Sequence, residues 1–195
     1  MKLNLNSHPL TFSHRSKVRL ILQTEAAECG LACLAMVAGY HGHRTDLATL
    51  RQAHSVSLKG TTLARVIEIA ERLELDSRPV RLELEDLEKL RTPAVLHWDL
   101  NHFVVLAGMK REGAVIMDPA HSRRTMSLGE VSKHFTGVAL ELLPRKGFRP
   151  KTERRRTSLG HLIGRMGGVG RVLGQILLLG TALERHPRDV TDALK

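Results

Sequence analysis

Aromatic residues make up only 3% of this 195-residue chain, and there are two cysteines, Cys29 and Cys33. Nucleic-acid bases stack on aromatic side chains, and these are scarce here. Nucleic acid is therefore not a predicted partner, despite a net charge of +10. Two cysteines are too few for the disulfide framework of a small secreted scaffold. The first 13 residues hold no apolar run long enough for a secretory signal. The chain is long enough, and at 42% hydrophobic residues apolar enough, to bury one substantial core.

Charge and hydropathy divide the chain into four predicted parts. Residues 1–14 form a lead-in, 15–143 a folded domain, 144–160 a basic linker, and 161–195 a partial or truncated membrane-proximal segment. Seven Lys or Arg and one acid lie between positions 145 and 156, which favours attraction to an anionic membrane surface. The apolar stretch 172–183 has about half of the roughly 20 residues that a membrane span needs. The sequence contains no phosphate-binding Gly-x-x-x-x-Gly-Lys-Ser/Thr loop, so we expect any ATPase to be a separate partner.

Helical patterns come first in the domain and strand patterns follow. The Ala- and Leu-rich stretch 29–40 predicts a buried helix, and further helices are predicted after Thr45 and over 62–73. From position 78, short runs rich in β-branched residues predict strands over 78–82, 93–98, 102–107, 114–118 and 138–143, with a short helix over 127–133. This order is typical of an α+β fold in which the N-terminal helices pack on one side of an antiparallel sheet.

One cysteine stands where chemistry is favoured. Cys29 follows a short polar segment and opens the predicted helix, and the unpaired N–H groups and dipole of a helix N-terminus favour the thiolate, which is the nucleophilic form. Gly30 allows a substrate backbone to approach closely. Gln23 is placed to donate its side-chain amide to a developing oxyanion. Cys33, one turn further along the same apolar helix, is predicted to be a buried core residue.

A base and an orienting group are available on the strands. His102 begins one predicted strand and Asp118 ends the next, and the turn near Gly113 joins them. Two antiparallel neighbours of this length bring both residues to the same edge of the sheet. We therefore expect Asp118 to accept a hydrogen bond from one imidazole nitrogen of His102 while the other nitrogen faces Cys29.

Three motifs carry a family resemblance. They are Gln23-Thr-Glu-x-x-Glu-Cys29-Gly, His97-Trp-x-x-Asn101-His102-Phe-Val-Val-Leu, and Asp118-Pro119. Together they resemble the bacteriocin-processing peptidase domain of ABC exporters of the colicin V secretion type, over about residues 15–143. The resemblance implies a papain-like fold and cleavage of double-glycine leader peptides at the cytoplasmic face of the bacterial inner membrane, coupled to export through an ABC transporter.

The same resemblance assigns roles to residues. It implies that Cys29 is the nucleophile, His102 the base, Asp118 the orienting group and Gln23 the oxyanion donor, with no cofactor and no metal. Many members of that family have Asp directly before the cysteine, where this chain has Glu28. The alternative function is a module that docks leaders without cleaving them.

Other polar residues receive weaker predictions. Trp98 and Asn101 are expected either to line the substrate cleft or to serve in the core and the turn. A metal site at His97 and His102 is not expected, because the two positions point to opposite faces. The remaining histidines are predicted to be surface residues: His41, His43, His54, His121 and His134. Gly167-Gly168 is predicted to be a flexible linker and not a site of self-cleavage.

Overall fold

The structure is a computed structural model that describes residues 17–54, 60–153 and 169–184. The chain divides into two compact units, Met1–Arg155 and Arg156–Lys195. Within the second unit the structure describes the helix α6 (Val169–Glu184), whose apolar side chains include Ile176, Leu177 and Leu178, all exposed. No described helix combines the length and the hydropathy that a membrane crossing requires. The predicted lead-in 1–14 and Gly167-Gly168 lie outside the described residues.

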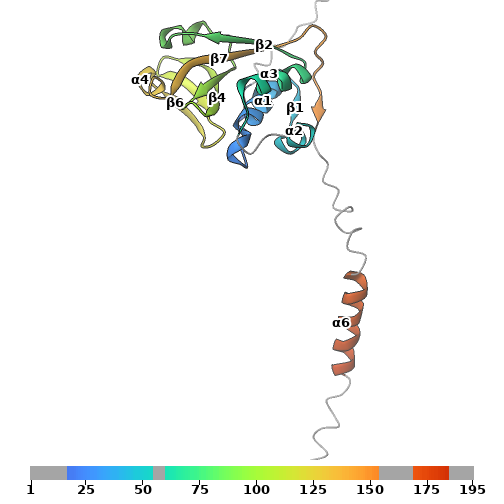
Figure 1. Cartoon of the computed structure of the whole chain (residues 1–195). Helices are drawn as coiled ribbons and strands as arrows, with labels where there is room; N and C mark the ends of the chain where they lie inside the picture. Colours follow the sequence, from blue (N-terminus) through green and yellow to red (C-terminus); the bar gives the residue numbers. More distant parts are fainter. Residues whose placement is uncertain (1–16, 55–59, 154–168, 185–195) are drawn as a thin grey trace, which may run out of the picture. The chain divides into compact units, whose positions relative to one another are not determined.

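Three helices open the first unit, as predicted (Figure 1). The helix α1 (Cys29–Tyr40) is buried from its first residue to Ala38, because it is apolar on every side. A short 3-10 helix, η1 (Ala26–Glu28), leads into it. The side chains of Asp46 and Thr62 cap α2 (Leu47–Ala53) and α3 (Leu63–Arg72), so the second helix begins one residue later than Thr45 suggested.

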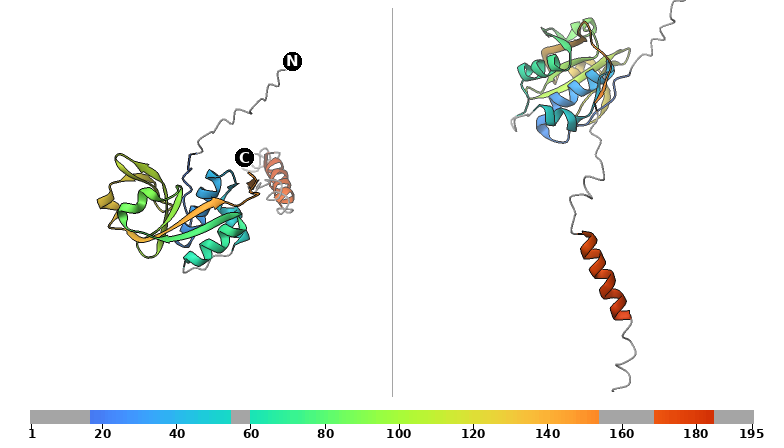
Figure 2. Two further views of the ribbon diagram at one scale, coloured as in Figure 1. Left: turned by 90° about the horizontal axis from the view of Figure 1, so that it is seen from above. Right: turned by 90° about the vertical axis from the view of Figure 1, so that its right-hand side faces the viewer.

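A six-stranded antiparallel sheet follows in the order β2-β7-β3-β4-β5-β6. The long strand β7 lies beside β2 at one side of the sheet (Figure 2). The edge strand β6 was not predicted, because its sequence Arg-Arg-Thr-Met carries no apolar alternation. The strands are β2 (Leu75–Arg81), β3 (Ala94–Trp98), β4 (His102–Lys110), β5 (Gly113–Met117), β6 (Arg123–Met126) and β7 (Phe135–Pro144).

Both faces of the sheet are covered, which is why its central strands are almost continuously apolar. On one face Phe103 and Val105 pack with the helices α1, α2 and α3. On the other face Val104 and Leu106 pack with Leu87 and Val131, which belong to η2 (Leu84–Lys89) and α4 (Leu128–Val131). The predicted α+β architecture with helices on an antiparallel sheet is confirmed, and the second covered face is an addition to it.

The compact unit extends past the predicted boundary at 143. A two-residue strand β8 (Thr152–Glu153) pairs in parallel with β1 (Arg44–Thr45). Phe148 packs against the core beneath the helices, and the buried His43 lies 3.2 Å from a carboxylate oxygen of Glu153. The first residues of the predicted basic linker therefore belong to the folded unit.

Candidate active site

The thiol of Cys29 lies where the helix begins. Cys29 is the first residue of α1, follows η1 directly and is only 3% exposed. The predicted position at a helix N-terminus is confirmed. Unpaired N–H groups and the positive end of the helix dipole converge there, so a negative charge on the sulfur is stabilised. Cys33 lies one turn further along, fully buried, and burial followed by the charges of Cys29 and Asp118 raises its pKa well above the usual range.

Glu28, the residue before the nucleophile, is a buried carboxylate that holds the preceding turn. One of its oxygens accepts hydrogen bonds from the backbone N–H groups of Thr24 and Glu25, both at 3.1 Å. Its other oxygen accepts a hydrogen bond from the Nε of Arg51 in α2. Burial raises the pKa of Glu28, but the bonds from Arg51 and from the two backbone groups outweigh it, so the pKa is lowered. The sequence did not indicate this pair, because nothing local relates a turn to a helix 23 residues away.

Gly30 is required by helix packing. A Cβ added at Gly30 would lie 3.0 Å from Cγ2 of Val66 and 3.2 Å from Cβ of Thr61. Thr61 also donates its hydroxyl to the backbone carbonyl of Ala27 in η1, at 3.3 Å. The start of α3 therefore presses against the turn that carries Cys29. The predicted close approach of a substrate at Gly30 remains a prediction, and the structure supplies a different reason for the glycine.

His102 and Asp118 meet as their strands predicted. β4 and β5 pair antiparallel, and Nε2 of His102 donates to Oδ1 of Asp118 over 2.9 Å. Cys29 is the other group near this ring, and its contact and its charge contribute to the pKa of His102. Burial lowers the pKa of His102, but the bonds to Asp118 and Cys29 and their negative charges raise it to about 9. At neutral pH the ring is therefore an imidazolium that lies between the sulfur of Cys29 and the carboxylate of Asp118.

Asp118 is a buried carboxylate with four donors. Oδ1 also accepts the backbone N–H of Ala120 at 2.9 Å, while Oδ2 accepts from Nδ1 of His121 at 2.9 Å and from Nη2 of Arg124 at 3.3 Å. Burial raises the pKa of Asp118, but the hydrogen bonds, that from His102 first, hold it far below its usual range. His121 and Arg124 were not predicted as site residues. The only signal for them was their position within six residues of Asp118.

Gln23 lies beside this pair through its backbone. Its N–H donates to the carbonyl of Pro119, the residue after Asp118, over 2.9 Å. Within the described residues its side-chain oxygen is buried without a hydrogen-bond partner. An oxyanion would be bound by the side-chain nitrogen and not by this oxygen, so the role of Gln23 stays a prediction.

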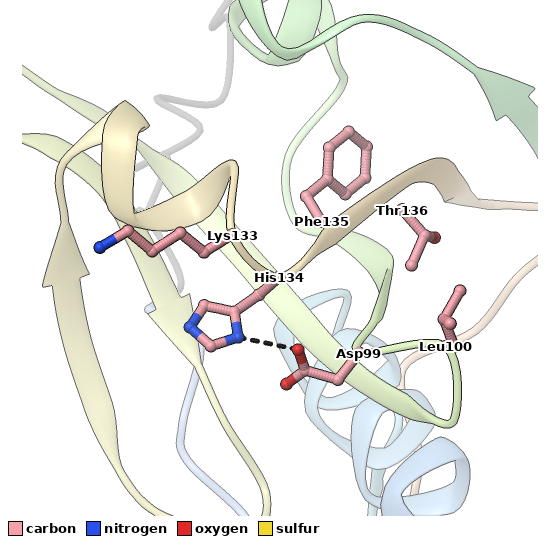
Figure 3. Close-up of a pocket in the computed structure, with 6 residues that line it drawn as sticks. All are labelled: Asp99, Leu100, Lys133, His134, Phe135 and Thr136. Carbon is pink, nitrogen blue, oxygen red and sulfur yellow. Dashed lines mark hydrogen bonds and ion pairs between the residues drawn. The ribbon is translucent and has the colours of Figure 1, made fainter.

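Trp98 and Asn101 have core and turn roles. Trp98 is 2% exposed and stacks on the ring of His134 at a centroid distance of 5.2 Å. The N–H of Asn101 donates to the carbonyl of Trp98 across the turn that precedes His102. Figure 3 shows how this turn is fastened: Nδ1 of His134 donates to Oδ1 of Asp99 over 2.8 Å. Asp99 has a positive φ of 48°, so this contact stabilises a backbone conformation that non-glycine residues rarely adopt.

The prediction that the other histidines are surface residues was wrong for His43 and His54, and it is confirmed for His121, whose side chain is 69% exposed. His43 is fully buried, His54 is 7% exposed, and Nε2 of His41 bonds the carbonyl of Leu142 at 3.2 Å. His121 and His134 bind aspartates. Strand register pairs His97 with Phe103 and Trp98 with His102, so His97 and His102 do face opposite ways as predicted. Among the described residues no group of three or more His, Cys, Asp or Glu is arranged to hold a metal ion.

A buried thiol at the head of a helix, beside an imidazole that a carboxylate orients from an antiparallel sheet, defines a papain-like cysteine peptidase. The chain belongs to the Peptidase C39 family, whose sequence model matches residues 17–147. The predicted family and fold are thereby confirmed.

Curated relatives and solved structures agree with this assignment. The chain is 46% identical over 168 residues to the colicin V secretion/processing ATP-binding protein CvaB of Escherichia coli, covering 86% of this chain and 24% of that protein. It therefore spans about a quarter of the length of this relative. A double-glycine motif protease from an AMS/PCAT transporter, solved with its leader peptide, is 38% identical with a TM-score of 0.63, covering 68% of this chain and 96% of that one. The peptidase domain of Streptococcus ComA is 29% identical with a TM-score of 0.60, covering 66% and 99%.

Proposed function

We propose that this cysteine peptidase removes double-glycine leader peptides from bacteriocin-like precursors, with Cys29, His102, Asp118 and Gln23 as its catalytic residues. The observation that carries the proposal is the grouping of three side chains: Cys29 acts on the ring of His102, and His102 is hydrogen-bonded to Asp118 at 2.9 Å. Support for the substrate comes from the similar protease solved with a leader peptide and from relatives named for secretion and processing. Glycines at the cleavage point suit a narrow site that excludes side chains, and a helical leader can dock by its apolar face.

The reaction follows the chemistry of an activated thiol. The Cys29 thiolate attacks the carbonyl carbon of the second leader glycine, and the negative charge moves to the carbonyl oxygen. The Gln23 side-chain amide and the backbone N–H of Cys29 stabilise that oxyanion. His102 then gives its proton to the leaving amine, which releases the mature peptide and leaves an acyl-enzyme. The neutral ring next takes a proton from water, whose oxygen attacks the thioester and frees the leader.

The proposed setting is the cytoplasmic face of the bacterial inner membrane, with the membrane and ATPase parts of an ABC exporter as partners. The relatives are secretion and transport ATP-binding proteins, which supports this pairing. We further infer that the exposed basic side chains Lys146 and Arg149 favour an anionic lipid surface. The exposed apolar side chains of α6 support a membrane-proximal role for residues 161–195.

The test is cleavage of a precursor whose leader ends in two glycines. The wild-type chain is compared with Cys29→Ala and with Cys33→Ala, which removes the other thiol from the same helix. We expect the mature peptide from wild type and Cys33→Ala, and none from Cys29→Ala, by mass spectrometry. Cleavage by Cys29→Ala, or no cleavage by wild type of a precursor that it binds, would overturn the proposal and in the second case favour a docking module.

A further inference from the structure

The second carboxylate oxygen of Asp118 carries bonds that the catalytic residues do not use. Oδ1 serves His102 and the N–H of Ala120, while Oδ2 faces Nδ1 of His121 and Nη2 of Arg124. The Asp118 side chain is 3% exposed, whereas those of His121 and Arg124 are 69% and 46% exposed. Two surface side chains thus close over a buried carboxylate from the solvent side.

Local backbone geometry brings both donors to the same oxygen. The N–H of Asp118 donates to the carbonyl of Ser122 at 3.0 Å, and the N–H of His121 donates back to the carbonyl of Asp118 at 3.2 Å. This tight turn folds His121 over the carboxylate. Arg124 follows on the edge strand β6, in register with Ile116. Its neighbour Arg123 alternates to the other face of the strand, and its side chain forms no hydrogen bond or ion pair with another described residue.

We propose that His121 and Arg124 are positioning residues, which fix the rotation of the Asp118 carboxylate so that Oδ1 stays aimed at His102. This inference rests on the proposed function. A carboxylate rotates easily about its Cβ–Cγ bond. When two donors hold Oδ2, the direction of Oδ1 is therefore fixed as well. Without these two donors Oδ2 would be buried and unpaired, and the carboxylate would turn toward water. The titratable groups that act at this point are His102 from β4, the thiols of Cys29 and Cys33 from α1, and the two positioning residues.

The experiment removes both donors and keeps a matched charge control. The test variant is His121→Ala/Arg124→Met, in which neither side chain can donate a hydrogen bond. The control is Arg123→Gln, which deletes the same charge from the same strand without touching Asp118. His121→Asn is the conservative variant, because its side-chain amide can supply an N–H near the place of Nδ1. Two quantities are measured: the pH profile of Cys29 alkylation by iodoacetamide, and kcat and KM on a double-glycine precursor. Mass spectrometry assigns the alkylated residue, and thermal melting checks the fold.

We expect the pH profile of Cys29 alkylation to change only in variants that lose a donor to Asp118. A disordered carboxylate stabilises the His102 imidazolium less, so the thiolate of Cys29 forms less readily, and the rise of the alkylation rate with pH moves to higher pH, by about one unit. We expect kcat to fall roughly tenfold with KM nearly unchanged, because the substrate does not touch these residues. Arg123→Gln follows wild type, and His121→Asn stays close to it.

Two outcomes would overturn the inference. One is a test variant that matches wild type in both the profile and kcat. The other is an equal shift in Arg123→Gln, which would assign the effect to diffuse surface charge. If wild type cleaves no double-glycine precursor, the proposed function fails on its own, and the alkylation profile still decides whether these residues position Asp118.

Discussion

Asp118 and His102 are joined by one hydrogen bond of 2.9 Å, although their side chains come from different strands. The bond ties a carboxylate that is ionised over the whole physiological range to a ring whose pKa is raised to about 9. The imidazolium therefore persists at neutral pH and supplies a positive charge beside the sulfur of Cys29.

The charge of Asp118 is expected to matter more than its shape. Asp118→Asn keeps the volume but removes the negative charge, so the pKa of His102 falls and the imidazolium is lost at lower pH. We expect kcat/KM at neutral pH to fall by about 10²-fold or more, as for other triads with a neutral orienting group. Initial cleavage rates measure this, and a change within about twofold would contradict the role.

Gln23 is expected to act on the oxyanion and not on the thiol. Gln23→Ala should lower kcat by about 10²–10³-fold, the usual loss for one oxyanion donor. Alkylation of Cys29 by iodoacetamide should keep its wild-type rate, because that reaction forms no oxyanion. The combination separates Gln23 from His102, whose replacement by Ala should slow both reactions. An alkylation rate that falls with kcat would show that Gln23 supports the thiolate instead.

Gly30 tests the packing of α3 on the nucleophile's helix. Gly30→Ala inserts a Cβ 3.0 Å from Val66 and 3.2 Å from Thr61, and overpacking of this kind costs about 1–3 kcal/mol. Gly39→Ala, in the same helix with nothing within 4 Å, is the matched control and should be neutral or stabilising. Urea unfolding compares the two. Val66→Ala should lower the free energy of unfolding less in the Gly30→Ala background than in wild type, because it also relieves the clash. Equal stability of the two single variants would exclude the clash.

The ion pair of Glu28 with Arg51 is expected to hold the turn before Cys29. Arg51→Gln leaves the buried carboxylate with only its backbone donors, Thr24 and Glu25. We expect a lower melting temperature and slower cleavage, because the start of α1 loses an anchor. Arg72→Gln is the control, since its exposed pair with Glu68 contributes little. If both variants melt and cleave alike, the buried pair has no special role.

Stability should depend on pH through His102. Its pKa in the folded chain, about 9, lies above the value of 6.5 for a free ring. The folded state therefore binds the proton more tightly, so the stabilisation is fully present below pH 6.5 and is lost as the pH rises through 9. Asp118 has a lowered pKa, so its contribution is present above its ordinary value and is lost only in strong acid. Urea unfolding at several pH values measures the alkaline loss, which His102→Gln should remove.

Motifs that are local in the sequence predicted much of this molecule. The helix 29–40 follows from an uninterrupted Ala- and Leu-rich run, and the three-helix start follows from apolar periodicity and capping residues. The contact of His102 with Asp118 could be predicted as well, because a short turn joins their strands and an antiparallel hairpin fixes which ends meet.

Tertiary structure alone decided the groups that support the site. Glu28 finds Arg51 only because α2 packs beside the start of α1, and Gly30 is needed only because α3 presses on it. His43 is buried and not at the surface, and it lies beside Glu153 of β8, the strand that pairs with β1. The sequence by itself thus predicted the candidate catalytic residues, because each lies in a short motif. The contacts that hold them depend on how helices and strands far apart in the chain pack, and side-chain patterns within one element do not encode that geometry.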